Sequence, residues 1–251
     1  MNWKIIRASM VGTSHIENGT KCQDCCWADE IQSPDNKSYL VTLVSDGAGS
    51  ALEGAKGSEL SCETLLESIS YAIDQQSNPL SKTNVIKWIK DTRQAILLLA
   101  EKNNLTPRDY ACTVLGAILT ADEALFFQIG DGAIVVAQRD IFGVVFWPDS
   151  GEYANSTYFI TDENALNSLR ITHVKSKINE IALFSDGLQH LALSYDSKTP
   201  HPPFFEPMFT VMRQRKTSNC DDLDEQLKLF LNSDAMNART DDDKTLVLAS
   251  C

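Results

Sequence analysis

Three runs of apolar residues in this sequence end at an Asp-Gly pair, and a fourth acidic cluster stands just before another apolar run. These acidic segments are Asp46-Gly47, Asp131-Gly132, Asp186-Gly187 and Asp241-Asp242-Asp243. An apolar, β-branched run predicts a buried strand, and Asp-Gly marks a tight bend where that strand ends. A scaffold can hold a carboxylate rigidly at a strand end, so each segment could serve a binding or catalytic site.

Four or more carboxylates brought into one small volume repel one another, and some stay protonated unless a cation neutralises them. A hard divalent cation with oxygen ligands, Mg²⁺ or Mn²⁺, suits such a set. A single Asp-Gly pair is usually an ordinary turn. The same combination of an apolar run and an acidic residue recurs, and the four segments follow a definite order along the chain. Both observations favour a metal site over four unrelated turns.

The ordered set of motifs resembles that of the metal-dependent Ser/Thr protein phosphatases of the type 2C class (the PPM family), and of its short bacterial members in particular. The matching segments are Gln23-Asp24, Asp46-Gly47-Ala48-Gly49-Ser50, Cys112-Thr113, Gly130-Asp131-Gly132, Ser185-Asp186-Gly187 and Asp242-Asp243-Lys244-Thr245. Each motif alone is weak evidence. The set is fairly specific because the order is kept over nearly the whole chain.

The resemblance implies a centre of two Mn²⁺ or Mg²⁺ ions. Asp46 would bridge the two ions, and the backbone carbonyl of Gly47 would be a further ligand. Asp186 and Asp242 would complete the shell of the first ion. A hydroxide shared by the two ions would attack phosphorus in line, because a metal ion lowers the pKa of its bound water.

Two further positions follow from the same resemblance. Asp24 would act from the outer shell or through a water molecule, and Asp131 matches a position associated with a third, weaker ion. The implied function is the hydrolysis of phosphoserine and phosphothreonine, with phosphorylated proteins as the partners.

Three departures from the family pattern affect phosphate binding and proton transfer. Gln23 stands where the family usually has Glu, and Ala48 stands where many members carry His, a suggested general acid. The loop before Asp24 lacks the usual phosphate-holding Arg and offers the cations His15 and Lys21 instead. A cationic hydrogen-bond donor is the best partner for a phosphate dianion, so His15 is a candidate phosphate contact. A lone His in a polar loop is more often simply solvated.

Two other functions stay open on the sequence alone. A phosphatase-like domain that binds phosphoproteins with weak or no turnover would account for the missing Arg and His. Phosphoryl transfer through an aspartyl-phosphate would also use Asp at strand ends, but it usually goes with a parallel βαβ order, whereas the early strands here look antiparallel. A nucleophile-elbow Ser and a P-loop are not indicated, because neither sequence pattern occurs.

Composition limits the partners and the compartment. The 22 Lys and Arg residues against 34 Asp and Glu residues give a formal net charge of −12, which argues against nucleic acid or an anionic membrane as a partner. No stretch is apolar over the about 20 residues that a membrane span needs, and no signal-peptide core is visible. Seven cysteines, an odd number, favour reduced thiols and therefore a cytoplasmic protein. Nothing indicates the oligomeric state.

The expected architecture is one domain over residues 1–251 of the α+β class, an antiparallel β-sandwich flanked by antiparallel helices. Strand-like runs stand at the two ends of the sequence. Apolar residues at helical spacing predict a helix pair in the about 50 residues after Ser50, interrupted near Pro79. A long helix pair packed on a sheet is the natural arrangement.

The middle and the last third of the chain carry three more specific expectations. Three strand-like runs predict a meander: 111–119, 124–129 and 133–137. Residues 139–177 predict a hairpin followed by an insertion that forms a flap beside the site. The Pro-rich segment around 198–207 predicts an irregular loop.

Overall fold

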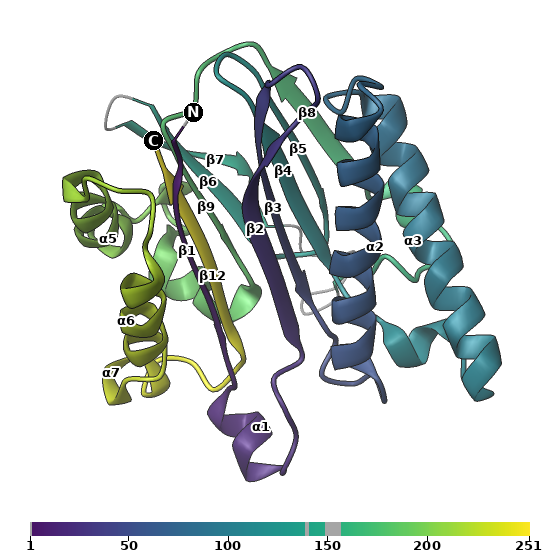
Figure 1. Cartoon of the computed structure of the whole chain (residues 1–251). Helices are drawn as coiled ribbons and strands as arrows, with labels where there is room; N and C mark the ends of the chain where they lie inside the picture. The colour runs from purple at the N-terminus through teal and green to yellow at the C-terminus, as the bar shows by residue number, and fades with distance from the viewer. Residues whose placement is uncertain (1, 139–140, 149–156) are drawn as a thin grey trace.

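The structure is a computed structural model that describes residues 2–138, 141–148 and 157–251. It contains two five-stranded antiparallel sheets, packed face to face and covered by helices on their outer faces (Figure 1). The first sheet contains, in spatial order, β1 (Lys4–Met10), β12 (Lys244–Ser250), β9 (Glu180–Phe184), β6 (Ala133–Gln138) and β7 (Ile141–Phe146). The second contains β2 (Asp24–Gln32), β3 (Ser38–Asp46), β4 (Val114–Leu119), β5 (Ala124–Ile129) and β8 (Arg170–Val174). The predicted β-sandwich is therefore confirmed.

Each sheet has its own pair of long helices. The second sheet carries α2 (Gly54–Asp74) and α3 (Lys82–Asn103), and the first carries α5 (Pro202–Gln214) and α6 (Asp221–Leu231) (Figure 1). The remaining elements are short: α1 (Thr13–Glu17), η1 (Pro107–Tyr110), η2 (Ala165–Asn167), η3 (Asp186–Leu188), α4 (Gln189–Ala192), β10 (Leu193–Ser194), β11 (Thr199–Pro200) and α7 (Asp234–Asn237). In the described ranges, no helix is long and apolar enough to cross a membrane.

The sequence of strand β3 is almost continuously apolar because both faces of the strand are buried. Successive side chains of a strand point to opposite faces of the sheet. Val41 and Leu43 pack in the core under α2 and α3, whereas Leu40 and Val44 pack between the two sheets. Both faces of β3 are thus covered, so polar residues cannot alternate with apolar ones, and Asp46 is the first acidic side chain that the strand reaches.

The predicted helix pair is confirmed, and its limits follow from local chemistry. Helix α2 turns a buried stripe toward the sheet, with Leu65, Ile69 and Ile73 at four-residue spacing. Asn104 follows α3 as its C-cap, and its left-handed backbone (φ 55°, ψ 38°) closes the last turn. The break between the helices falls at residues 75–81, around the predicted Pro79.

The predicted meander is wrong in its third strand. β4 and β5 pair as expected, but β6 pairs with β9 and β7 in the other sheet. The cause lies in the turn after β5, where Gly130 has a positive φ of 106° that L side chains rarely adopt. This turn redirects the chain across the sandwich and leaves Asp131 at the junction between the sheets.

The Pro-rich segment is not the irregular loop predicted around 198–207, because α5 begins at Pro202. Proline is tolerated in the first turn of a helix, where its missing N–H would have no intrahelical partner. Pro202 and Pro203 occupy that turn, and Pro207 lies inside the helix. Apolar contacts of α5 with the sheet outweigh the local cost of Pro207.

The predicted flap over 139–177 lies partly outside the described residues, which omit 139–140 and 149–156. Among the described residues of the segment no two strands pair with each other as a hairpin; β7 pairs with β6, which precedes the segment. Later residues of the same segment form β8, the edge strand of the second sheet. Residues 170–174 are thus part of the sandwich, and a flap stays a prediction for the rest.

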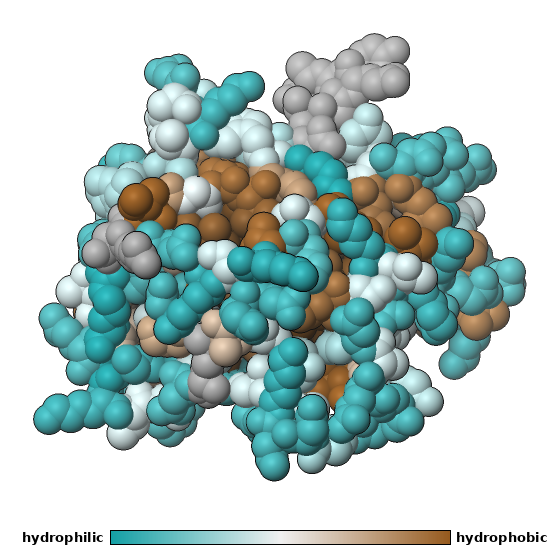
Figure 2. Space-filling view, turned by 90° about the horizontal axis from the view of Figure 1, so that it is seen from above, coloured by the Kyte–Doolittle hydropathy of each residue, from teal (hydrophilic) through white to brown (hydrophobic). Residues whose placement is uncertain are grey.

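The acidic strand ends meet at one end of the sandwich. β3, β5 and β9 run toward the end where α1 lies, and β2 and β12 start there (Figure 1). Figure 2 looks onto the opposite end, where exposed apolar side chains form a band between hydrophilic ones. Antiparallel pairing therefore brings segments that are up to about two hundred residues apart in sequence to the α1 end.

Candidate metal centre

Asp24 and Asp46 face each other across one hairpin. β2 and β3 pair antiparallel with Asp24 opposite Asp46, so both side chains point to the same face. The backbone of Asp46 is held by Thr113 on both sides: its N–H donates to Thr113 Oγ1 at 3.0 Å, and its carbonyl accepts from the Thr113 N–H at 2.8 Å. The hairpin therefore fixes a pair of carboxylates at the α1 end of the second sheet.

Ser185 connects this pair to the first sheet. Its hydroxyl donates to Asp24 Oδ2 at 2.7 Å and accepts from the Thr245 N–H at 3.1 Å. Ser185 follows β9 and Thr245 lies in β12, so one hydroxyl joins three of the motifs. Asp186, the next residue, is consequently placed beside Asp24 and Asp46.

Gly187 brings the Asp186 and Asp242 segments together. A Cβ atom at Gly187 would lie 2.1 Å from the carbonyl oxygen of Asp243 and 3.4 Å from Cβ of Asp242. Only a residue without a side chain allows the two backbones to approach this closely. The glycine after Asp186 is thus required by packing, in addition to ending the strand.

We expect Gly187→Ala to destabilise the protein, because the added methyl group overlaps backbone atoms that cannot move without shifting Asp242. Overpacking of this kind typically costs about 1–3 kcal/mol of the free energy of unfolding. A urea titration measures this loss, with Gly143→Ala as control, since a Cβ at Gly143 meets nothing within 4 Å. Equal stability of the two variants would contradict the tight approach at Gly187.

Three of the clustered carboxylates, Asp24, Asp46 and Asp186, have pKa values above the usual range for Asp. Burial raises the pKa of Asp24 to about 6, against the opposing hydrogen bonds from Thr245 and Ser185. Burial and the charges of Asp131 and Asp242 raise the pKa of Asp186 to about 7. Burial, followed by the charges of Asp24 and Asp186, holds the pKa of Asp46 well above its ordinary value. These shared effects show that all five carboxylates lie close together.

The chemistry of this donor set fits a hard divalent cation. The donors are carboxylate oxygens, the ligands that Mg²⁺ and Mn²⁺ prefer. Asp24 Oδ1 is buried and has no hydrogen-bond partner among the described residues, so it can accept from a bound water or face a cation. Within the same residues no three acidic, His or Cys side chains are arranged as ligands of one ion, and Asp46 and Asp186 hydrogen-bond to each other instead.

Asp131 lies on the Asp186 side of the cluster. Its charge is the largest contribution, after burial, to the raised pKa of Asp186. Thr157 donates a hydrogen bond to its Oδ2, and the Gln189 side chain donates to its backbone carbonyl at 2.6 Å. The junction between β5 and β6 therefore places Asp131 next to the predicted metal ligands.

Gly47 is enclosed by backbone. A Cβ atom there would lie 2.4 Å from the carbonyl carbon of Gly54 and 2.8 Å from the carbonyl oxygen of Gln23, which also accepts the Gly47 N–H. The end of β3, the start of α2 and the loop before β2 meet at this point. The glycine allows that meeting, directly behind Asp46.

His15, the predicted phosphate contact, is anchored by a residue that was not predicted. Its Nδ1 lies 2.9 Å from Oδ1 of Asp243, close enough for an ion pair when the ring is protonated, although the ring orientation does not complete a hydrogen bond. Its Nε2 lies 3.8 Å from the Cβ position of Gly49. His15 therefore lies against the Asp46–Ser50 turn.

Asp243 organises the whole loop that carries His15. Its buried carboxylate accepts backbone N–H groups of Gly12 and Gln23, each at 2.6 Å. These contacts tie both ends of the loop to the start of β12. Asp243 could have been noticed from its place in the Asp242-Asp243-Lys244-Thr245 motif. In that motif the adjacent Asp242 was the predicted metal ligand.

Lys244 is a second residue that was not predicted. It is fully buried, and its Nζ donates to the carbonyl of Asp242 at 3.3 Å. Burial lowers the pKa of this lysine, while the nearby carboxylates of Asp243 and Asp242 oppose the shift. Its sequence signal was a single cation inside an acidic motif.

Comparisons with known proteins agree with this geometry. The profile of the protein phosphatase 2C family matches residues 11–232. Serine/threonine-protein phosphatase 3 of Escherichia coli (strain K12) is 39% identical over 249 residues, which cover 99% of this chain and 98% of that protein.

Solved structures share the fold at low sequence identity. The serine/threonine phosphatase Stp1 from Staphylococcus aureus matches with a TM-score of 0.65 and 15% identity, covering 100% of this chain and 95% of that one. The catalytic domain of the serine/threonine protein phosphatase PstP, solved in complex with two manganese ions, matches with a TM-score of 0.63 and 13% identity, covering 99% and 98%. The sandwich, its order of acidic strand ends and the family profile lead to one assignment: the chain belongs to the protein phosphatase 2C family.

Proposed function

We propose that this chain, a serine/threonine protein phosphatase of the 2C family, hydrolyses phosphomonoesters at a centre of two Mn²⁺ or Mg²⁺ ions held by Asp46, Gly47, Asp186 and Asp242. The observation that carries the proposal is the convergence of the strand ends: Asp46 lies opposite Asp24 across the β2–β3 pair, and Asp186 follows Ser185, whose hydroxyl donates to Asp24. A relative of the same fold that was solved with two manganese ions supports it.

The ions, when bound, supply a water molecule of lowered pKa and neutralise the charge of the phosphate. The residues of the chain position these groups. Asp46 would be the ligand shared by the two ions, since it ends β3 opposite Asp24 and hydrogen-bonds to Asp186. Asp24 has one oxygen fixed by Ser185 and the other unpartnered, so it can orient a water molecule at the centre.

Asp131 is the candidate ligand of a third, weaker ion. Its Oδ2 already accepts a hydrogen bond from Thr157, so an ion there would compete with a neutral donor. Its charge acts on Asp186, which places the additional position on that side of the pair. A weaker ion is therefore expected next to Asp186.

The substrates are phosphorylated proteins, and the measurement is release of inorganic phosphate from phosphoserine, phosphothreonine and phosphotyrosine peptides. We expect release from the first two with Mn²⁺ present. Binding of the phosphopeptides without release would favour the phosphoprotein-binding alternative. An acid-stable phosphoenzyme after rapid quenching would favour the aspartyl-phosphate route instead.

We further propose that His15 contacts the substrate phosphate. It is held beside the Asp46–Ser50 turn by Asp243, in the loop where the usual Arg is missing. His15→Ala is expected to raise KM about tenfold, the effect of about 1.4 kcal/mol from one charge-assisted contact, with a much smaller change in kcat. Steady-state kinetics on a phosphothreonine peptide measures both constants.

His173→Ala is the control for this variant. His173 lies 2.8 Å from Glu123 through its Nε2, on the edge strand β8, so its loss should leave KM unchanged. Equal KM values for wild type and His15→Ala would contradict the proposed phosphate contact and show that His15 is a solvated loop residue.

We infer a cytoplasmic location from the cysteines. All seven are free thiols, and disulfides are normally absent from proteins of reducing compartments. Fractionation of cells that produce the protein, followed by immunoblotting, tests this location.

A further inference from the structure

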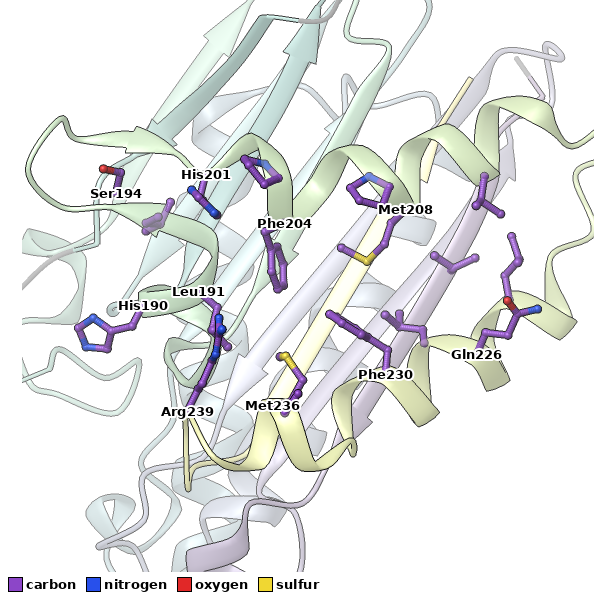
Figure 3. A pocket seen from close by; sticks show the side chains of 18 residues that line it. His190, Leu191, Ser194, His201, Phe204, Met208, Gln226, Phe230, Met236 and Arg239 are labelled. Atoms are coloured by element: carbon purple, nitrogen blue, oxygen red, sulfur yellow. The ribbon is translucent and has the colours of Figure 1, made fainter.

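An apolar groove of about 760 Å³ opens between α5 and α6, on the outer side of the first sheet (Figure 3). Figure 3 shows the two helices running along its long sides, with Phe204 and Met208 projecting from α5 and Phe230 from α6. Ile6 of β1 is part of its floor. The groove lies outside the carboxylate cluster described above.

The sequence of each helix explains the groove. In α5, Phe204, Met208 and Val211 lie at helical spacing and line the groove, while the neighbouring stripe of Phe205, Phe209 and Met212 is buried against the sheet. In α6 the matching stripe is Leu223, Leu227 and Phe230. Each helix thus has more apolar surface than the sheet covers, and Val211 and Phe230 stay 44% and 41% exposed.

One end of this groove carries an arginine and two histidines. Arg239, His190 and His201 gather there, from the segment after α7, from α4 and from the start of α5 (Figure 3). Among the described residues the Arg239 guanidinium has no ion pair, and no Asp or Glu side chain lines the groove. In a chain of net charge −12, an unpaired cation at the end of an apolar groove favours an anionic ligand group.

We propose that the groove binds a long-chain carboxylate, with one acyl chain between α5 and α6 and its carboxylate at Arg239. Each water-sized group occupies about 30 Å³, so 760 Å³ holds about 25 non-hydrogen atoms, which is enough for one chain of about 16 carbons. The apolar side chains that line the groove can bury a hydrocarbon chain, which has no hydrogen-bonding groups. An extended peptide would instead bring N–H and C=O groups that those walls leave without partners.

The probe is hexadecanoate, titrated below its micellar concentration into the full chain by isothermal calorimetry. We expect saturable binding of one molecule per chain. Methyl hexadecanoate, which lacks the charge, should bind at least about tenfold more weakly than hexadecanoate. Tetradecanoate, which is two methylene groups shorter, should also bind about tenfold more weakly than hexadecanoate. Absence of saturable binding, or equal binding of acid and methyl ester, would overturn the proposal.

Two variants locate the ligand, and both change exposed residues whose replacement leaves the core intact. Arg239→Gln should weaken hexadecanoate about tenfold and abolish the preference over the methyl ester. Val211→Glu, which places a carboxylate in the apolar wall, should weaken binding of both compounds at least about tenfold. Hexadecanoate binding that is unchanged in both variants would place the ligand elsewhere and overturn the proposal.

Matched controls come from the same two helices. Arg215→Gln removes a cation near the end of α5 that pairs with Asp222 and does not line the groove. Leu229→Glu makes the same kind of change as Val211→Glu on a residue of α6 that is 74% exposed and outside the groove. Both controls should bind hexadecanoate like wild type, and a loss equal to that of the groove variants would overturn the assignment.

Discussion

Replacing Asp46 by Asn is expected to lower kcat by about three orders of magnitude or more. A bridging carboxylate positions both ions and the attacking water, so its loss removes several contributions at once. The neutral amide also removes one of the charges that the cation pair would balance. Steady-state phosphate release from a phosphothreonine peptide, with saturating Mn²⁺, measures the effect.

The loss should not come from unfolding. Asn has nearly the shape of Asp, and its backbone can keep both bonds to Thr113. Removing one charge from a cluster of like charges should leave the thermal midpoint of the metal-free protein equal or higher. Asp29→Asn, on the exposed far part of β2, is the control and should keep wild-type turnover. Near-wild-type kcat in Asp46→Asn would show that the bridge lies elsewhere.

Removal of divalent cations is expected to have the second large effect. Chelation with EDTA should reduce phosphate release to background, and added Mn²⁺ or Mg²⁺ should restore it, because the bound ions would supply the attacking water. Ions that bind only the folded state also stabilise it. The thermal midpoint should therefore rise with Mn²⁺ concentration in wild type.

Asp186→Asn separates this stabilisation from a general salt effect. Asp186 hydrogen-bonds to Asp46 and lies among four other carboxylates, so its variant should lose most of the Mn²⁺-dependent rise. Asp29→Asn should keep the rise. Undiminished phosphate release after exhaustive chelation would contradict the metal requirement, and an equal rise in both variants would contradict the placement at Asp186.

The location of the candidate site could be predicted because it depends on a local pattern. A buried strand that ends at Asp-Gly places its carboxylate at a sheet end, and this holds for Asp46 and Asp186 without knowledge of the other strands. Asp24 follows from the pairing of neighbouring strands through a short turn. The order of the motifs then predicted that positions far apart in the sequence belong to one site, which no local pattern could indicate.

The crossing of β6 to the other sheet could not be predicted, because it depends on which strand edge offers hydrogen bonds to Ala133–Gln138. Three apolar runs with short turns fit a meander equally well by pattern alone. The start of α5 was missed for a related reason. Prolines usually mark loops, whereas here they occupy the first turn of a helix whose later residues are held by contacts with the sheet.

The role of Asp243 could not be predicted from the sequence. Asp241, Asp242 and Asp243 are chemically identical, and all three precede β12 (Lys244–Ser250), so no alternation along a strand distinguishes them. Asp243 is buried and accepts the N–H groups of Gly12 and Gln23, while Asp242 is exposed and its Oδ1 accepts the N–H of Asp243. Only the tertiary contacts of Asp243 with the loop before β2 distinguish the two.

Anomalous diffraction at the manganese edge, from crystals grown with Mn²⁺, tests the central claim most directly. We expect two ions at the α1 end of the sandwich, both within about 2.1–2.6 Å of Asp46 oxygens and one of them bound by Asp186 and Asp242. Manganese peaks that avoid these carboxylates, in crystals of enzyme that still hydrolyses phosphothreonine peptides, would contradict it.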